Sequence, residues 1–453
     1  MERPFGQLGL QPASVLLFCA LLMSGASAVE ERIGERLFLI RDKPGTPTQF
    51  QMIVNAGCAD EAGGECRGLA HYLEHLVLVG RNPEHKDAAV RFFPDGYANG
   101  WTNLRATAYV HSVPARASGP QADLEQLFAF YAARLKDFSI SPEEAVRERN
   151  VVRQEHDWGV ASRPFPRFAR MLDRALLPDH PMGQWTIGTK ENIGAFALDD
   201  AKVLHRNWYA INNVSFVLKG DIEPAALKDI ADRALTGLAP RRLPPRARLQ
   251  EPQIVVERKD FREEDAQVRR AGLYVKKLFR MEEPDLVGNR AARQIVLNFL
   301  RSRLPGSPYD MIVDRAKLAA GQPFVALIRI APKTFMLTVG ADAAPDVEPE
   351  QLLAGIAGYV AALANNGIPA QTIARLQTRF AEARANADKD PAQVYARLVA
   401  WLAQGSRYED LAAWPQRIAA VTPNDVATIL QGLSGPGRMV TGILVPAKPE
   451  PKP

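Results

Sequence analysis

The sequence is poor in cysteine and histidine, and it has no long hydrophobic run and no basic block interleaved with aromatic residues. Its 453 residues include three cysteines and seven histidines. The 56 basic and 51 acidic residues are mixed along the chain, so the net charge of +5 indicates a solvated surface rather than a nucleic-acid interface. A composition of 47% hydrophobic and 24% charged residues is typical of a globular protein.

The N-terminal residues have the pattern of a secretory signal. An apolar run from Val15 to Met23 is followed by Ala26-Ser27-Ala28, a small-x-small cleavage site. The run is shorter than the roughly 18 apolar residues that a membrane-spanning helix needs, so we expect no membrane anchor. The sequence predicts a signal peptide over residues 1–28, cleaved after Ala28, and an exported, periplasmic mature protein.

Removal of the signal also removes Cys19 and leaves Cys58 and Cys66, which lie close together in GCADEAGGECRG. In an oxidising compartment such a pair, with glycines between its members, is expected to form a disulfide. Two free thiols are the alternative.

The two halves of the mature chain follow one plan. Strand patterns in RLFLIRD and TQFQMIVNAG open the first half, amphipathic helical patterns follow, and a strand pattern in NNVSFVLKGDI closes it. The helical segment that begins at Ile140 aligns with one that begins at Ile368, and the closing strands align at nearly the same offset. The repeat predicts an α+β fold of two homologous domains, each a mainly antiparallel sheet packed against helices.

The domain boundaries follow from composition. A stretch dense in Pro and Arg is typical of a linker. We expect a first domain over residues 29–236, a linker over 237–253, a second domain over 254–446 and a Pro- and Lys-rich tail over 447–453.

The stretch GLAHYLEHLVLVG, residues 68–80, carries His71, Glu74 and His75 in an apolar helical run. Residues four apart lie on one face of a helix, so the two imidazoles can point at one metal ion. Two imidazoles and a carboxylate make a typical catalytic zinc set with a position left for water, on which Glu74 can act as general base. A helix that merely carries polar residues is the alternative. The second half has no counterpart of this pattern.

A third ligand is expected from the helical segment RERNVVRQEHDW, in which Glu148 and Glu155 lie two turns apart on one face. We predict that Glu155 binds the metal and that Glu148 accepts a hydrogen bond from a ligating imidazole. His156 is a rival ligand, but it points about 100° away from Glu155 on the helix. A solvated helix face is the alternative for this segment. The remaining histidines have no partner at ligand spacing and are expected to be structural or surface residues: His85, His111, His180 and His205.

These motifs resemble those of the pitrilysin/insulinase family of zinc peptidases, in which the order of the metal-binding motif is inverted. The resemblance covers nearly all of the mature chain, in the short two-domain form of the smaller bacterial members and of mitochondrial processing peptidase. It implies one zinc ion per chain, bound by His71, His75 and Glu155. Glu74 would then be the general base, and Glu148 would lie behind the ligands.

The segment ANGWTNLRATAYVHSVP is similar to the family's Asn-Ala-x-Thr strand, with Gly100 where the family commonly has Ala. The resemblance implies that Asn99 hydrogen-bonds the substrate near the scissile bond and that Trp101 forms an apolar subsite wall. An edge strand beside the metal can bind an extended peptide through main-chain hydrogen bonds, which give affinity without reading sequence. A place in the core is the alternative for Trp101.

Taken with these motifs, the sequence predicts a zinc endopeptidase that cleaves peptides or unfolded polypeptides. A metal-activated water would attack the scissile carbonyl, and Glu74 would take a proton from that water and pass it to the leaving amine. The alternative is a non-catalytic peptide-binding or assembly subunit of the same fold, a kind of relative that usually lacks the His-Glu-His set.

The family also places an Arg and a Tyr in its non-zinc half, where they hold the substrate backbone. In the corresponding stretch, IVDRAKLAAGQPFV, Arg315 matches the Arg, and Phe324 stands at or near the Tyr position. Phenylalanine has no hydroxyl to donate to a developing oxyanion. We therefore expect a dimer with a homologous subunit that supplies Arg and Tyr, with a homodimer as the runner-up.

Overall fold

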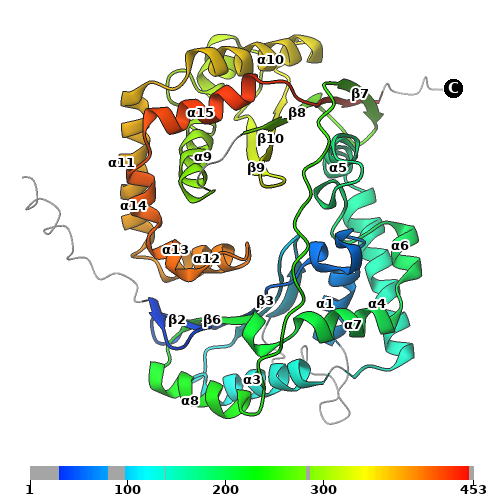
Figure 1. Cartoon of the computed structure of the whole chain (residues 1–453), viewed down its shortest axis with the longest axis vertical. Coiled ribbons are helices and arrows are strands. Elements are labelled where there is room, and N and C mark those ends of the chain that lie inside the picture. Colours follow the sequence, from blue (N-terminus) through cyan, green and yellow to red (C-terminus); the bar gives the residue numbers. More distant parts are fainter. Residues whose placement is uncertain (1–29, 80–96, 138, 282–285, 448–453) are drawn as a thin grey trace, which may run out of the picture.

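The computed structural model describes residues 30–79, 97–137, 139–281 and 286–447. The predicted signal peptide, His85 and nearly all of the predicted tail lie outside these ranges. Within them the chain forms two sheets, the first-half sheet in the lower part of Figure 1 and the second-half sheet in the upper part.

The first sheet has six strands in the order β1-β2-β6-β3-β5-β4. β2 and β6 run parallel, and the other neighbouring strands are antiparallel. The strands are β1 (Glu30–Arg32), β2 (Leu37–Arg41), β3 (Thr48–Val54), β4 (Tyr97–Thr102), β5 (Thr107–Val113) and β6 (Val214–Gly220).

The second sheet repeats this arrangement with five strands in the order β7-β11-β8-β10-β9. β7 and β11 run parallel and the rest are antiparallel, so β7-β11-β8-β10-β9 corresponds strand for strand to β2-β6-β3-β5-β4. This confirms the predicted α+β fold with two mainly antiparallel sheets. The strands are β7 (Arg258–Asp265), β8 (Gly272–Arg280), β9 (Phe324–Arg329), β10 (Thr334–Asp342) and β11 (Met439–Pro446).

Several helices begin where a side chain caps them. Ser141 accepts a hydrogen bond on its Oγ from the backbone N–H of Glu144 at 3.2 Å, as expected for the N-cap of α4. The first half contains α1 (Leu69–Val79), α3 (Gln121–Lys136), α4 (Pro142–Glu155), α5 (Pro164–Leu176), α6 (Lys190–Ala195), α7 (Leu198–Trp208) and α8 (Pro224–Leu235). The second contains α9 (Leu286–Leu300), α10 (Pro349–Asn366), α11 (Ala370–Ala387), α12 (Pro391–Leu402), α13 (Tyr408–Ala412), α14 (Trp414–Ala419) and α15 (Pro423–Ser434).

No single helix in the described ranges has both the length and the apolar composition to cross a membrane. α10 and α11 meet that test only together, as a pair bent by 101°.

The two halves exchange one helix each. α5 belongs to the first half by sequence, but it packs on the second sheet, where Phe168 and Leu172 are buried against Val440 and Leu444 of β11. Figure 1 shows α5 beside β7 and β8, away from the first sheet.

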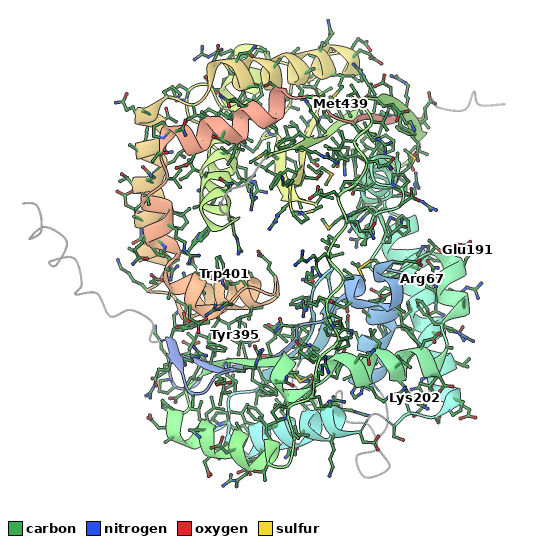
Figure 2. The ribbon with its side chains drawn as sticks, in the orientation of Figure 1. Arg67, Glu191, Lys202, Tyr395, Trp401 and Met439 are labelled. Carbon is green, nitrogen blue, oxygen red and sulfur yellow. A yellow bond between two sulfur atoms is a disulfide. The ribbon has the colours of Figure 1, made fainter. Side chains whose placement is uncertain are left out.

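α12 makes the reciprocal contact. It belongs to the second half and lies on the first sheet, where Leu398 shares an apolar cluster with Phe38 and Ile40 of β2. The hydroxyl of Tyr395 on α12 donates to Gln51 Oε1 on β3 at 3.2 Å; Figure 2 shows this residue between its helix and the sheet. Each sheet is therefore covered on one face by its own helices and on the other by a helix of the other half. The domain boundaries stay a prediction, and the packing crosses them.

Residues 237–257, which contain the predicted linker, form no helix or strand but are bound to both halves. The backbone N–H of Arg241 donates to Asn212 Oδ1 at 3.0 Å, and Arg246 lies 5.4 Å from the ring centre of Trp208. At the other end Glu251 accepts a hydrogen bond from the backbone N–H of Lys333 at 2.6 Å. The segment is therefore fixed against the halves that it joins.

The exchange of α5 yields a stability prediction. A Cβ at Gly442 of β11 would lie 2.6 Å from atoms of both Phe168 and Leu172, so only glycine lets α5 approach this closely. We expect Gly442→Ala to lower the free energy of unfolding by about 1–3 kcal/mol, measured by urea denaturation, because the helix must move away from the sheet.

Gly358→Ala in α10 is the matched control, since a Cβ there meets nothing within 4 Å. In a helix this change should stabilise the protein by about 0.5–1 kcal/mol. A Gly442→Ala protein as stable as the wild type would show that α5 does not depend on this close approach.

Candidate metal centre

The site is built on α1, whose apolar face is buried in the first half. Tyr72, Leu73 and Leu76 are almost fully buried, which leaves the i and i+4 pair of His71 and His75 facing α4. The Tyr72 hydroxyl donates to the carbonyl of Ala145 at 2.6 Å and thereby joins α1 to α4.

The structure brings the three predicted ligands together. Glu155 Oε2 lies 3.7 Å from His71 Nε2 and 3.3 Å from His75 Nε2. One ligand atom from each residue lies within 4.8 Å of the other two. The imidazole side chains are 12% and 17% exposed, whereas Glu155 is 50% exposed, so the cluster opens to solvent on the side of Glu155.

Glu148 lies behind the cluster, with its Oε2 3.7 Å from His75 Nδ1 and its side chain 5% exposed. Burial by itself would lower the pKa of His75, but the two carboxylates of Glu148 and Glu155 outweigh it and raise the pKa to about 9. His71 has the opposite balance, because burial and the neighbouring His75 lower its pKa. Two acids around two imidazoles form an environment that favours a cation.

A zinc ion fits this donor set. Tetrahedral coordination at about 2.0–2.2 Å places ligand atoms about 3.3–3.6 Å apart, close to the two N–O distances of 3.3 and 3.7 Å. Imidazole nitrogens and a carboxylate oxygen are the ligands that catalytic zinc prefers. The Nδ1 atom of His71 is buried and has no hydrogen-bond partner among the described residues, so hydrogen bonding alone does not account for the way this ring is held.

Glu74 occupies a different environment from the ligands. Its side chain is turned toward β4, where Oε2 accepts a hydrogen bond from the Thr102 hydroxyl at 2.6 Å. The residue is only 4% exposed, and burial raises the pKa of its carboxyl to about 7. A carboxylate with such a pKa can both accept and release a proton near neutral pH.

His156, the rival ligand, points away from the cluster. It begins a π-helical turn (His156–Ala161), its ring lies 5.3 Å from that of Trp185, and its Nδ1 lies 3.2 Å from Asp157.

The other described histidines have structural contacts. His205 Nε2 donates to the carbonyl of Arg134, His180 Nδ1 accepts from the N–H of Met182, and His111 contacts the Tyr131 hydroxyl.

The predicted substrate residues lie on β4, at the edge of the first sheet. The amide of Asn99 donates to the Tyr97 hydroxyl at 2.5 Å, and Asn99 is exposed. Trp101 is half-buried against the apolar cluster that α12 shares with the first sheet. Its position therefore combines the two alternatives, a core contact and a partly open face, and its role as a subsite wall stays a prediction.

Arg315 and Phe324 are not joined to the metal cluster by any hydrogen bond or ion pair in the described ranges. Arg315 ends a π-helical segment (Tyr309–Arg315) and pairs with Asp310 at 3.0 Å. Phe324 begins β9, the edge strand of the second sheet, and is 56% exposed. A substrate contact by Arg315 stays a prediction.

Sequence reasoning missed the residue that fixes the start of α1. Glu61 lies in the loop closed by the Cys58–Cys66 disulfide, and its carboxylate accepts hydrogen bonds from the backbone N–H groups of Arg67, Gly68 and Ala70 at 2.6–3.2 Å. A capping side chain normally bonds a backbone N–H three residues further along the chain, whereas Glu61 bonds that of Ala70, nine residues away. No local sequence pattern therefore indicates that Glu61 caps α1.

The structure has the fold of M16-type peptidases. The match with a putative M16-like peptidase from Alicyclobacillus acidocaldarius covers 92% of this chain and 98% of that chain, with a TM-score of 0.74 and 18% identity. The match with the periplasmic protease PqqL from Escherichia coli covers 93% of this chain and 48% of that chain, with a TM-score of 0.72 and 15% identity. At these identities the likeness concerns the fold.

Sequence comparison points to the same group. The family described as Peptidase M16 inactive domain matches residues 195–380, a range that begins after Glu155 and contains none of the candidate metal ligands. Zinc protease PqqE of Helicobacter pylori is 23% identical over 193 residues, which are 42% of this chain and 42% of that protein. The matched segment therefore spans less than half of this curated relative. Together these findings confirm the resemblance to the pitrilysin family.

The cap on α1 can be tested without reference to function. Removing the Glu61 carboxylate leaves two buried N–H groups and one partly buried N–H group without their acceptor, so Glu61→Ala should cost about 1–3 kcal/mol of unfolding free energy in urea. Glu65→Ala in the same loop is the control, because Glu65 is exposed and pairs only with Arg67. Its effect should stay within about 0.5 kcal/mol. Equal losses in the two variants would show that Glu61 does not cap α1.

Proposed function

We propose that this chain is a zinc-dependent endopeptidase that cleaves peptides or unfolded polypeptides. The observation that carries the proposal is the convergence of His71, His75 and Glu155 from two helices to within 4.8 Å, with Glu74 buried beside them. The similarity to zinc protease PqqE supports it.

In this proposal His71, His75 and Glu155 hold one zinc ion per chain. When bound, zinc would polarise the scissile carbonyl and lower the pKa of water. Glu148, beside Nδ1 of His75, orients that ring and its lone pair. Glu74 takes the proton of the attacking water and returns it to the leaving amine, a task that suits its raised pKa.

The substrate would lie along β4 as an additional strand. β4 pairs with β5 on one side only, and no described strand pairs with its other edge. Main-chain hydrogen bonds to this edge accept any extended sequence, which fits unfolded polypeptides better than folded ones. Asn99, exposed on the strand, would bond the substrate near the scissile bond.

A non-catalytic peptide-binding or assembly subunit is the second candidate, and the match to a domain described as inactive favours it. That match falls outside the metal-binding residues, however, and His71, Glu74, His75 and Glu155 all lie in the first half. Metal content measured together with cleavage of a quenched peptide separates the two candidates.

We also propose export to the periplasm, supported by the Cys58–Cys66 disulfide and by the fold shared with the periplasmic protease PqqL. The disulfide indicates an oxidising compartment. The predicted signal peptide agrees with this location.

Partnership with a homologous subunit is part of the proposal. This chain corresponds to 48% of PqqL, so that protein has room for a second unit of similar size in the same chain. Phe324 offers no hydroxyl where the family has Tyr, and a second subunit could supply both the Arg and the Tyr. A homodimer is the runner-up.

The catalytic assignment predicts that Glu74→Gln keeps zinc and loses cleavage. The amide cannot accept the proton of water, so the rate should fall by about 10²–10⁴-fold or more, while plasma mass spectrometry still finds one zinc per chain. His71→Ala and Glu155→Ala should lose zinc as well, because each removes a ligand. Full activity of purified Glu74→Gln would refute this mechanism.

The partnership predicts that the chain alone is slow. Loss of one oxyanion donor typically lowers the rate about 10²–10³-fold, so a homologous subunit with Arg and Tyr should raise cleavage by that order. Light scattering gives the mass of each preparation, and the quenched peptide gives its rate. Full-rate cleavage by the chain at monomer mass, with no gain from any homologous subunit, would contradict the idea.

A further inference from the structure

The carboxylate of Glu74 is held by β4 and by none of the metal ligands. Its Oε2 accepts the Thr102 hydroxyl at 2.6 Å across 28 residues of sequence. A hydroxyl has a single proton to donate, and a carboxylate is a stronger acceptor than a neutral oxygen. Thr107 Oγ1 lies 3.3 Å from the same hydroxyl but donates its own proton to the carbonyl of Ala56 at 2.9 Å. The proton of Thr102 is therefore committed to Glu74.

Gly100 provides the surface on which the Glu74 side chain rests. A Cβ at this position would lie 2.8 Å from Glu74 Cγ and would collide with Oε1. Gly100 and Thr102 are two apart on the strand and so face the same side of the sheet, toward α1.

Thr102 itself is fixed by the turn that follows β4. Asn103 Oδ1 accepts hydrogen bonds from the backbone N–H groups of Arg105 and Ala106, both at 2.7 Å. The carbonyl of Asn103 accepts from the N–H of Cys58 in the disulfide loop at 3.0 Å. The side-chain amide of Asn103 donates to the carbonyl of Ala403, just beyond α12, at 3.4 Å. Asn103 is therefore bound to both halves of the chain, and it fixes the backbone of its neighbour Thr102.

We propose that Thr102 is the positioning residue of the general base, acting together with Gly100. This inference rests on the proposed function of Glu74. The Thr102 hydrogen bond selects one rotamer of a side chain with three freely rotating torsions, and it occupies Oε2. Oε1 is left to take the proton of the attacking water. Without the bond the carboxylate divides its time among rotamers, and the fraction that is correctly placed falls.

The central test compares Thr102→Val with Thr102→Ser in zinc-loaded protein. Valine keeps the shape of threonine and removes the donor, so kcat should fall by about tenfold to a hundredfold, with KM changed less than twofold and one zinc still bound. Serine keeps the donor and should restore most of kcat. Thr378→Val on α11 is the matched control, because Thr378 bonds only the carbonyl of Ala374 on an exposed helix face. Its kcat should equal that of the wild type.

A second comparison separates positioning from general structural damage. In a Glu74→Gln background Thr102→Val should cause no further loss of the residual rate, since it acts only through the carboxylate. Gly100→Ala should lower kcat in the same way and fold normally, because the group displaced is the end of a flexible side chain. A further loss in the Glu74→Gln background would overturn the inference.

Crystal structures of the zinc-free proteins provide a readout independent of activity. In Thr102→Val the Glu74 carboxylate should leave Gly100 and occupy more than one rotamer, whereas in Thr102→Ser it should stay. A single unchanged rotamer in Thr102→Val, or a wild-type kcat, would refute the role of Thr102. Absence of cleavage by the zinc-loaded wild type would instead refute the proposed function, so the two failures are distinguishable.

Discussion

The candidate centre depends on the way α1 is held at its start and against two neighbouring elements. Glu61 accepts the free N–H groups at its start, the Tyr72 hydroxyl joins it to α4, and Thr102 joins its Glu74 to β4. Each bond is buried or partly buried, where a hydrogen bond is costly to break. A helix held in this way cannot rotate or slide without breaking one of them. The imidazoles of His71 and His75 therefore keep a constant relation to Glu155.

The second half serves the site although it carries no metal ligand. α12 covers the open face of the first sheet, and the carbonyl of Ala403 accepts a hydrogen bond from Asn103 in the turn beside Thr102. In return, α5 covers the open face of the second sheet and places the partly buried Asp173 against the buried Lys276 of β8. This exchange makes each half incomplete without the other, because either sheet alone would expose an apolar face.

The electrostatics of the centre favour a divalent cation. Glu148 and Glu155 approach His75 from two sides, and Glu74 lies buried beside it. Burying the carboxylates of Glu74 and Glu148 beside one imidazole is unfavourable unless positive charge compensates them. A protonated His75 supplies part of that charge, as its raised pKa indicates. A metal ion would supply more, and Nε2 of His71, which lies 3.7 Å from Glu155 Oε2, would bind it.

The local features of this protein follow from patterns within single segments of its sequence. The four-residue spacing of His71 and His75 and the seven-residue spacing of Glu148 and Glu155 each follow from the periodicity of one helix, and the repeat of the two halves follows from segments that align at a nearly constant offset. Such patterns were sufficient to predict the fold class and to select the residues that meet at the centre, because a regular element fixes which side chains share a face.

The contacts between distant segments depend on how the helices and strands pack together. The bonds from Glu61 to α1 and from Thr102 to Glu74 and the exchange of α5 and α12 join residues with no periodic relation in sequence. The same holds for Trp101, whose side of the sheet could be read from alternation but whose half-burial depends on α12. Such contacts arise when elements pack in three dimensions, and a pattern within one element carries no information about which other element will cover it.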